Sequence, residues 1–194
     1  RGGGQADPTL RLGDIAELEE AQRHAAGGKE LDVPVALEPR RPMGVLAALD
    51  RHRVSFVVIG GLARVIHGTG ETTADVDIVP SPRPENLRRL SAALEEIGAE
   101  VPAFDVDAPA TIGTSLGDVT VMLTPAGTRG WDDLRRAANR ESLGRGLRPS
   151  VASPGDLARM LAATDRDEDA PKLRRLRRLI QLERELSRGL SIER

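Results

Sequence analysis

The feature that most constrains the fold is an apolar run that ends on two glycines and is soon followed by two aspartates. The run covers residues 54–59 and is rich in β-branched side chains, which favours a strand, and Gly60 and Gly61 break it. Further along, Asp75 and Asp77 alternate with valine and isoleucine, as on a strand that has one polar face. The sequence therefore predicts two short strands, with a glycine turn and an acidic face close together.

This pair of motifs suits phosphate chemistry. A glycine turn that leads into a helix exposes backbone amides to an approaching phosphate. Asp75 and Asp77 project from one strand face about 7 Å apart and repel each other unless a cation lies between them. Mg²⁺ takes one or two carboxylates together with substrate phosphates, as in phosphoryl and nucleotidyl transfer. Each motif alone is also typical of a plain turn or a solvated strand face, and it is their combination that predicts a site.

Composition excludes several classes of protein. The chain has no cysteine, which excludes disulfides, thiolate metal sites and a cysteine nucleophile and favours a reducing compartment. No apolar run approaches the roughly 18 residues that cross a bilayer, and the first ten residues lack the order of a signal peptide. We therefore expect a cytoplasmic protein with no membrane partner, built as one compact unit.

Periodicity and chain breakers predict an uneven alternation of helices and strands. Helices are expected at about residues 10–26, 43–52, 62–68, 84–98, 130–139, 154–163 and 169–188, strands at 54–59 and 76–79, and extended pieces at 99–106 and 118–123. This order favours an α+β (mixed α/β) fold, a small mixed β-sheet flanked by helices with a helical C-terminal part. The predicted division is an N-terminal appendage and linker at 1–42, a core at 43–127 and a mainly helical region at 128–194.

Charge is distributed unevenly. Residues 1–127 carry 12 lysines and arginines against 19 acidic residues, a sum of −7, whereas residues 128–194 carry 16 against 11, a sum of +5. The densest basic set lies on the last expected helix and consists of Arg174, Arg175, Arg177 and Arg178. Two interpretations stay open for it. The arginines bind an RNA backbone, or they pair with the acidic residues that precede the helix, Asp165, Asp167, Glu168 and Asp169.

The stretch "FVVIGGLARVIHGTGETTADVDIV" resembles the core motif of the minimal nucleotidyltransferases of the polymerase-β superfamily, in particular the AbiEii/MenT-like toxin group. The positions in step with that motif are Gly60, Gly61, Ala63, His67, Gly68, Thr73, Asp75 and Asp77. Later segments are also similar, so the resemblance covers roughly residues 43–170. It implies a nucleotidyltransferase core at 43–127, Mg²⁺-dependent transfer of an NMP from an NTP to an acceptor, for some members the tRNA 3′ end, and an antitoxin partner.

The chain departs from the group at three polar positions. The superfamily's third acidic residue matches Thr120, and Asp118, on the same strand face, is the candidate to complete the metal site or to serve as base. Glu71 stands where a basic residue often precedes the aspartates, and Leu161 stands where relatives carry a lysine. Two alternatives therefore stay open: a degenerate, non-catalytic module that binds a nucleotide or a partner, and a nucleotidyltransferase that modifies a small molecule such as an antibiotic.

Further residues are candidates for contacts with the nucleotide. Thr73 belongs to the resembling motif, and Arg64, one helical turn behind the glycines, is placed to reach a phosphate or else is a surface arginine. His67 either caps helix carbonyls or contacts substrate. Arg166 and Asp169 match a later polar pair of the group.

Overall fold

The structure, a computed structural model, describes residues 40–192. The helix expected at 10–26 and most of the appendage expected at 1–42 lie outside these residues. In chain order the elements are α2 (Arg40–Arg51), β1 (Phe56–Ile59), α3 (Gly60–Ile66), β2 (Val76–Pro80), α4 (Pro84–Glu96), β3 (Ala110–Thr114), β4 (Gly117–Val121), α5 (Trp131–Leu134), β5 (Asn139–Arg140), β6 (Ser150–Val151), α6 (Pro154–Thr164), the 3₁₀ turn η2 (Asp167–Asp169) and α7 (Ala170–Ile192).

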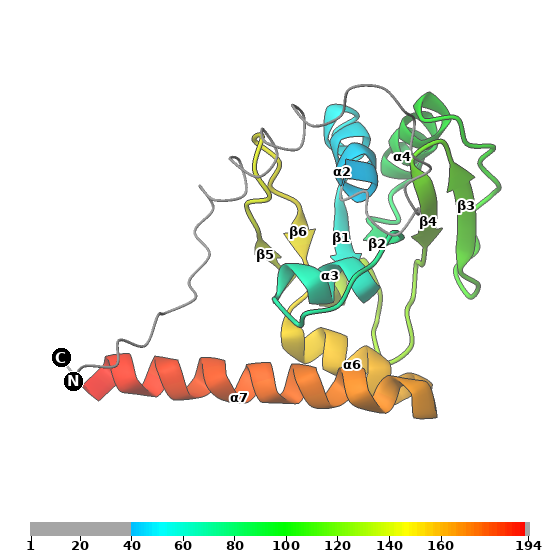
Figure 1. The fold of residues 1–194 in the computed structure, drawn as a ribbon. Helices are drawn as coiled ribbons and strands as arrows, with labels where there is room; N and C mark the ends of the chain where they lie inside the picture. The colour runs from blue at the N-terminus through cyan, green and yellow to red at the C-terminus, as the bar shows by residue number, and fades with distance from the viewer. Residues whose placement is uncertain (1–39, 193–194) are drawn as a thin grey trace, which may run out of the picture. The chain divides into compact units, whose positions relative to one another are not determined.

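The strands form one mixed sheet in the order β3-β4-β2-β1-β6-β5 (Figure 1). β1 pairs antiparallel with β2 and parallel with β6, while β2 pairs parallel with β4. The two outer pairs, β3 with β4 and β5 with β6, are antiparallel. The register sets Asp77 opposite Ile59 on one side and Thr120 on the other, so this aspartate lies at the centre of the sheet. The mixed α/β fold with a small mixed sheet is confirmed.

The central strands are buried on both sides because helices pack around them. Val57, Val58 and Ile78 have no exposed surface. α2 and α4 pack against each other, and α4 begins with Pro84 and buries one apolar stripe, as its sequence pattern predicts. This packing holds β1 and β2 rigidly and so fixes the ends of both strands, where the glycine turn and the aspartates lie.

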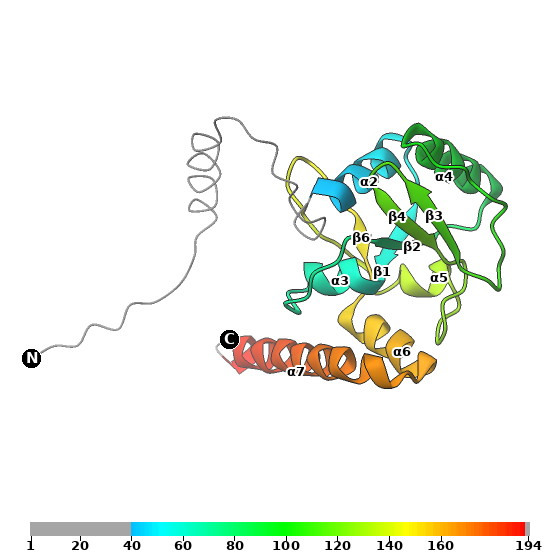
Figure 2. The ribbon, with the colours of Figure 1, turned by 45° about the vertical axis from the view of Figure 1, so that its right-hand side comes forward.

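α6 and α7 lie together near the end of β1 that leads into α3, and α7 continues past α6 in both views (Figures 1 and 2). The hydroxyl of Ser153 accepts a hydrogen bond from Asp156 N at 3.1 Å, so Ser153 is the N-cap of α6. Leu176 of α7 is fully buried. No helix within residues 40–192 has the length and apolar character needed to cross a membrane.

Several expected elements differ from the structure. The extended piece expected at 99–106 is a loop, because Pro102 has no amide to give to a ladder and Asp105 bonds locally to Asp107 N. β3 was not predicted, because Ile112 is the only large apolar residue in its sequence ATIGT, so no alternation of large apolar and polar side chains marks the strand. The helix expected at 130–139 is shorter in the structure, where α5 covers only Trp131–Leu134. The sheet also takes β5 and β6 from the region after residue 127, and the predicted boundary there stays a prediction.

Candidate active site

The turn between β1 and α3 is shaped around the carboxylate of Asp77. Gly60 has a φ of +61°, and a Cβ atom added there would lie 1.9 Å from Asp77 Oδ2. The amide of Gly61 donates to the same oxygen at 3.3 Å, and a Cβ atom on Gly61 would stand 2.9 Å from Thr73 Oγ1. Glycine is required at position 60 because of this close approach and its positive φ, and a side chain at position 61 would force Thr73 to shift. The amide of Gly61, which was expected to face a phosphate, thus faces Asp77.

Asp77 is half-buried and its carboxylate is destabilised. Burial raises its pKa above the ordinary value, the hydrogen bond from Gly61 opposes the rise, and the charge of Asp75 adds to it. Arg64 and the hydroxyl of Thr120 lower the pKa by smaller amounts. Asp75 is exposed and lies one residue before β2. Two neighbouring carboxylates, one of them partly removed from water, attract a cation to this end of β2.

Asp118 lies on β4 and is exposed. It is two residues before Thr120, the residue paired with Asp77, and it is the register partner of Gly113 in the β3 pairing. Among residues 40–192, no group of three or more histidine, aspartate or glutamate side chains is close enough to hold a metal ion. Asp75 and Asp77 as metal ligands therefore stay a prediction from the sequence.

Arg64 and Glu71 form an ion pair beside the aspartates. Arg64 Nε lies 2.9 Å from Glu71 Oε2, and both side chains are largely buried, with 11% and 13% of their surface exposed. The other oxygen of Glu71 lies 3.4 Å from Nη1 of Arg175, on α7. Glu71, which replaces a basic residue of the resembling group, thus links α3 to α7 and holds Arg64 in place.

His67 and Thr73 have structural contacts. His67 is the C-cap residue of α3, and its Nε2 donates to the carbonyl oxygen of Ala152 at 2.8 Å, which ties α3 to the segment between β6 and α6. Thr73 Oγ1 lies near Gly61 and donates to the carbonyl oxygen of Asp75 at 3.4 Å. Thr73 therefore supports the loop that carries the aspartates, and His67 supports the base of α3.

A cleft of about 280 Å³ opens in front of Asp77. One wall is the glycine turn with Arg64, and the facing wall comes from α6, η2 and the start of α7. The residues that line it are Ile59, Gly60, Gly61, Arg64, Asp77, Met122, Pro125, Ala126, Leu157, Met160, Leu161, Thr164, Arg166, Asp169 and Lys172. The predicted Arg166 and Asp169 are therefore brought to the same cleft as the glycines and Asp77.

The cleft contains a lysine that sequence reasoning did not select. Lys172 Nζ lies 2.7 Å from Oδ1 of Asp169, and Thr164 Oγ1 donates to the other carboxylate oxygen at 3.3 Å. The hydrogen bond from Lys172 lowers the pKa of Asp169 below its ordinary value. Leu161, at the position where relatives carry a lysine, lines the same cleft. The sequence feature that could have drawn attention to Lys172 is that the chain has only two lysines.

The mixed sheet, the strand-glycine-helix turn and the acidic residues on the adjacent strand are consistent with a nucleotidyltransferase fold. No family model matches the sequence, and no curated protein matches it. Among solved structures, the chain is similar to a lincosamide antibiotic adenylyltransferase, LnuA, in its lincomycin-bound form, with a TM-score of 0.56 at 13% identity over 74% of this chain and 99% of that one. It is also similar to the antibiotic-resistance factor ANT(2'')-Ia, with a TM-score of 0.51 at 15% identity over 79% of this chain and 95% of that one. At these identities the likeness shows the fold.

Proposed function

We propose that the protein is a Mg²⁺-dependent nucleotidyltransferase that moves an NMP from an NTP to an acceptor hydroxyl. The observation that carries the proposal is the carboxylate of Asp77, held 3.3 Å from the amide of Gly61 inside a cleft that also contains Arg64 and Lys172. Negative charge to hold a metal and positive charge to hold a triphosphate thus meet in one cleft. The fold shared with known nucleotidyltransferases supports the same reaction class.

The donor set fits Mg²⁺. Asp75 and Asp77 supply two carboxylate ligands and the phosphates of the NTP supply further oxygens, which is the coordination that Mg²⁺ prefers. The raised pKa of Asp77 supports this, because a bound cation offsets the burial and the repulsion from Asp75. When bound, Mg²⁺ orients the phosphates and neutralises charge that develops on them.

Lys172 and Arg64 are assigned to the phosphates. Leu161 occupies the position on α6 where relatives carry a lysine. Lys172, on α7, places an ammonium group in the same cleft. Its side chain is 35% exposed, so it remains accessible from the cleft while Asp169 orients it. Arg64 is held by Glu71 and lines the wall of the glycine turn. Two cations facing one cleft offset the charge of a triphosphate that the aspartates would otherwise repel.

Asp118 is assigned to the acceptor. In the reaction a bond forms between the acceptor oxygen and the α-phosphorus, the bond from that phosphorus to the β-phosphate oxygen breaks, and pyrophosphate leaves. The proton of the acceptor hydroxyl must go to a base. Asp118 is an exposed carboxylate on β4, on the same strand face as Thr120, which pairs with Asp77. We therefore assign to Asp118, the acidic residue of β4, the role of taking that proton.

The acceptor that we favour is an RNA 3′ end, tRNA included. All four arginines at the start of α7 are exposed, and in the described part of the chain only Arg175 has an ion-pair partner, Glu71. The acidic residues before the helix do not pair with these arginines: Asp169 pairs with Lys172, and Glu168 lies 3.9 Å from Arg166. The arginines thus extend a positive surface from Lys172 outward, as an RNA backbone requires. An antitoxin partner remains a prediction from the resemblance of the motif.

A small-molecule acceptor is the second candidate. It is favoured by the likeness to LnuA, a lincosamide antibiotic adenylyltransferase with lincomycin bound, and to the antibiotic-resistance factor ANT(2'')-Ia. The apolar part of the cleft, with Met122, Leu157 and Met160, offers surface for such a ligand.

The test is transfer of label from α-labelled NTPs at millimolar Mg²⁺ or Mn²⁺, with tRNA and with a panel of lincosamides and aminoglycosides as acceptors. We expect label in one acceptor class, no transfer by Asp77→Asn, and a raised KM for NTP in Lys172→Gln that Lys172→Arg restores in part. Lys29→Gln is the matched control, since Lys29 is the chain's other lysine. NTP binding by calorimetry with no transfer to any acceptor would instead assign the protein to the non-catalytic binding class.

The RNA acceptor has its own test. Arginines that contact phosphates release counterions, so RNA affinity should fall steeply between about 50 and 200 mM salt. Changing Arg174, Arg175, Arg177 and Arg178 to serine should weaken RNA binding and lower the salt slope by about 3. Arg88→Ser with Arg89→Ser, on the exposed face of α4, is the control. Unchanged RNA affinity in the quadruple variant, with circular dichroism intact, would remove α7 from the RNA interface.

A further inference from the structure

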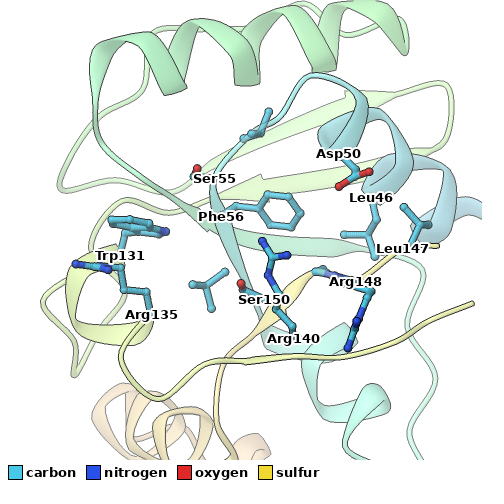
Figure 3. A pocket seen from close by; sticks show the side chains of 13 residues that line it. Leu46, Asp50, Ser55, Phe56, Trp131, Arg135, Arg140, Leu147, Arg148 and Ser150 are labelled. Atoms are coloured by element: carbon cyan, nitrogen blue, oxygen red, sulfur yellow. The ribbon is translucent and has the colours of Figure 1, made fainter.

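A second cavity, of about 210 Å³, lies at the start of β1, whereas the cleft described above lies at its end. It is enclosed by α2, β1, α5 and the β5–β6 segment (Figure 3). Its lining residues are Leu46, Asp50, Val54, Ser55, Phe56, Val57, Trp131, Arg135, Arg140, Leu147, Arg148, Pro149 and Ser150. The two cavities share no lining residue, so a molecule bound here is not bound in the cleft of Asp77.

Three arginines line this cavity. The guanidinium of Arg135 lies 4.8 Å from the centre of the Trp131 ring, and Nε of Arg135 donates to Asp132 at 2.9 Å. These two contacts hold the Arg135 side chain in position. Within residues 40–192, the side chains of Arg140 and Arg148 have neither a hydrogen-bond partner nor an ion-pair partner. In Figure 3 the side chain of Arg140 extends toward Phe56, between Trp131 and Asp50.

The backbone of one hairpin carries two of these cations, Arg140 and Arg148. Arg140 lies on β5, opposite Ser150 of β6, and Glu141 N bonds to the carbonyl oxygen of Pro149 at 3.1 Å. The hairpin thus brings Arg140 and Arg148 to the same rim. The lining residues carry three positive charges and one negative charge, that of Asp50, which leaves a formal charge of +2. Gathered cations repel one another unless an anion lies between them.

We propose that this cavity binds the phosphate group of a small ligand. A phosphate carries a charge of about −1.5 to −2 at neutral pH, which matches the lining. Its oxygens accept from several guanidinium groups at once, and arginine forks suit that geometry. The volume is below the roughly 300 Å³ at which pockets for drug-sized ligands begin, so it accepts a phosphate with a small attached group. Asp50 and the serine hydroxyls are placed to bond to a hydroxylated group.

The chain carries its own reporter for this site. Trp131 is the only tryptophan, and there is no tyrosine, so fluorescence excited near the tryptophan band comes from the cavity alone. The full chain would be titrated with inorganic phosphate, with ribose 5-phosphate and with a short single-stranded RNA. We expect a saturable fluorescence change with inorganic phosphate and, more tightly, with ribose 5-phosphate. Tightest binding of the RNA would overturn the proposal of a small ligand and assign the cavity to an RNA backbone.

Substitutions separate this site from the cleft. Arg140→Gln and Arg148→Gln should each weaken binding about tenfold or more, because each removes hydrogen bonds to a charged group. Arg88→Gln, an exposed arginine on α4, is the matched control and should change nothing, as should Asp77→Asn in the cleft. Phosphate binding that survives in the double variant of Arg140 and Arg148, or no binding of any of the three probes by fluorescence and calorimetry, would overturn the proposal.

Discussion

Replacing Gly60 with alanine tests whether the turn is built around Asp77. Alanine at a φ of +61° costs about 1–2 kcal/mol, because a side chain is strained in the left-handed region. The added Cβ atom would also lie 1.9 Å from Oδ2 and 2.6 Å from Cγ of Asp77, so the carboxylate or the turn must move. Overpacking of this kind costs about 1–3 kcal/mol more. We expect Gly60→Ala to lower the free energy of unfolding by about 2–5 kcal/mol in total.

Gly70→Ala is the matched control for this variant. Gly70 has a φ of +70°, and a Cβ atom added there meets nothing within 4 Å, so only the backbone strain of about 1–2 kcal/mol should appear. Both variants lose the same backbone freedom in the unfolded chain, so the comparison isolates the collision with Asp77.

Urea unfolding followed by circular dichroism gives the two free energies, and NTP binding by calorimetry reports the site. Gly60→Ala should lose NTP binding while Gly70→Ala keeps it. Equal losses of stability in the two variants, together with intact NTP binding in Gly60→Ala, would refute the idea that the glycine turn and Asp77 form one unit.

Other predictions concern charge and burial. The folded-state pKa of Asp77 is raised, so the folded protein binds more protons than the unfolded chain as pH falls through that pKa. Acidification should therefore stabilise the wild type relative to Asp77→Asn. Urea unfolding across the acidic range measures this difference. At neutral pH, Asp77→Asn should be the more stable protein, and millimolar Mg²⁺ should raise the Tm of the wild type but not of the variant. Asn86 is buried and bridges Ser55 and Ser81 through bonds of 2.7, 2.9 and 3.0 Å, so Asn86→Ala should cost about 2–4 kcal/mol in the same urea assay.

Much of the central fold was predictable because its signals are local. The runs that became β1 and β2 show β-branched residues and alternation within a few positions, and α4 shows one apolar stripe behind Pro84. Gly60, Gly61 and Asp77 were also found by spacing, and the structure places them in contact. Signals of this kind need no knowledge of the rest of the chain.

β5, β6 and β3 were not predictable for the opposite reason. β5 and β6 are two residues long, and β6 forms only because Val57 and Val58 offer it a parallel partner about ninety positions earlier in the chain. Ladder pairing between distant segments depends on how the chain packs, which a short window of sequence does not contain. His67 likewise had two possible roles until the carbonyl of Ala152 was placed beside it.

The sequence by itself determined the pieces with local causes: two strands, the glycine pair and the acidic face that follows it. Only the tertiary structure decided which charges meet. Glu71 reaches Arg175 across 104 positions, Lys172 lines the cleft of Asp77, and arginines from the C-cap of α5, from β5 and from the segment before β6 line one cavity. The physical reason is that a charged side chain is acceptable in sequence almost anywhere on a surface, and its function depends on the partner that folding brings within reach.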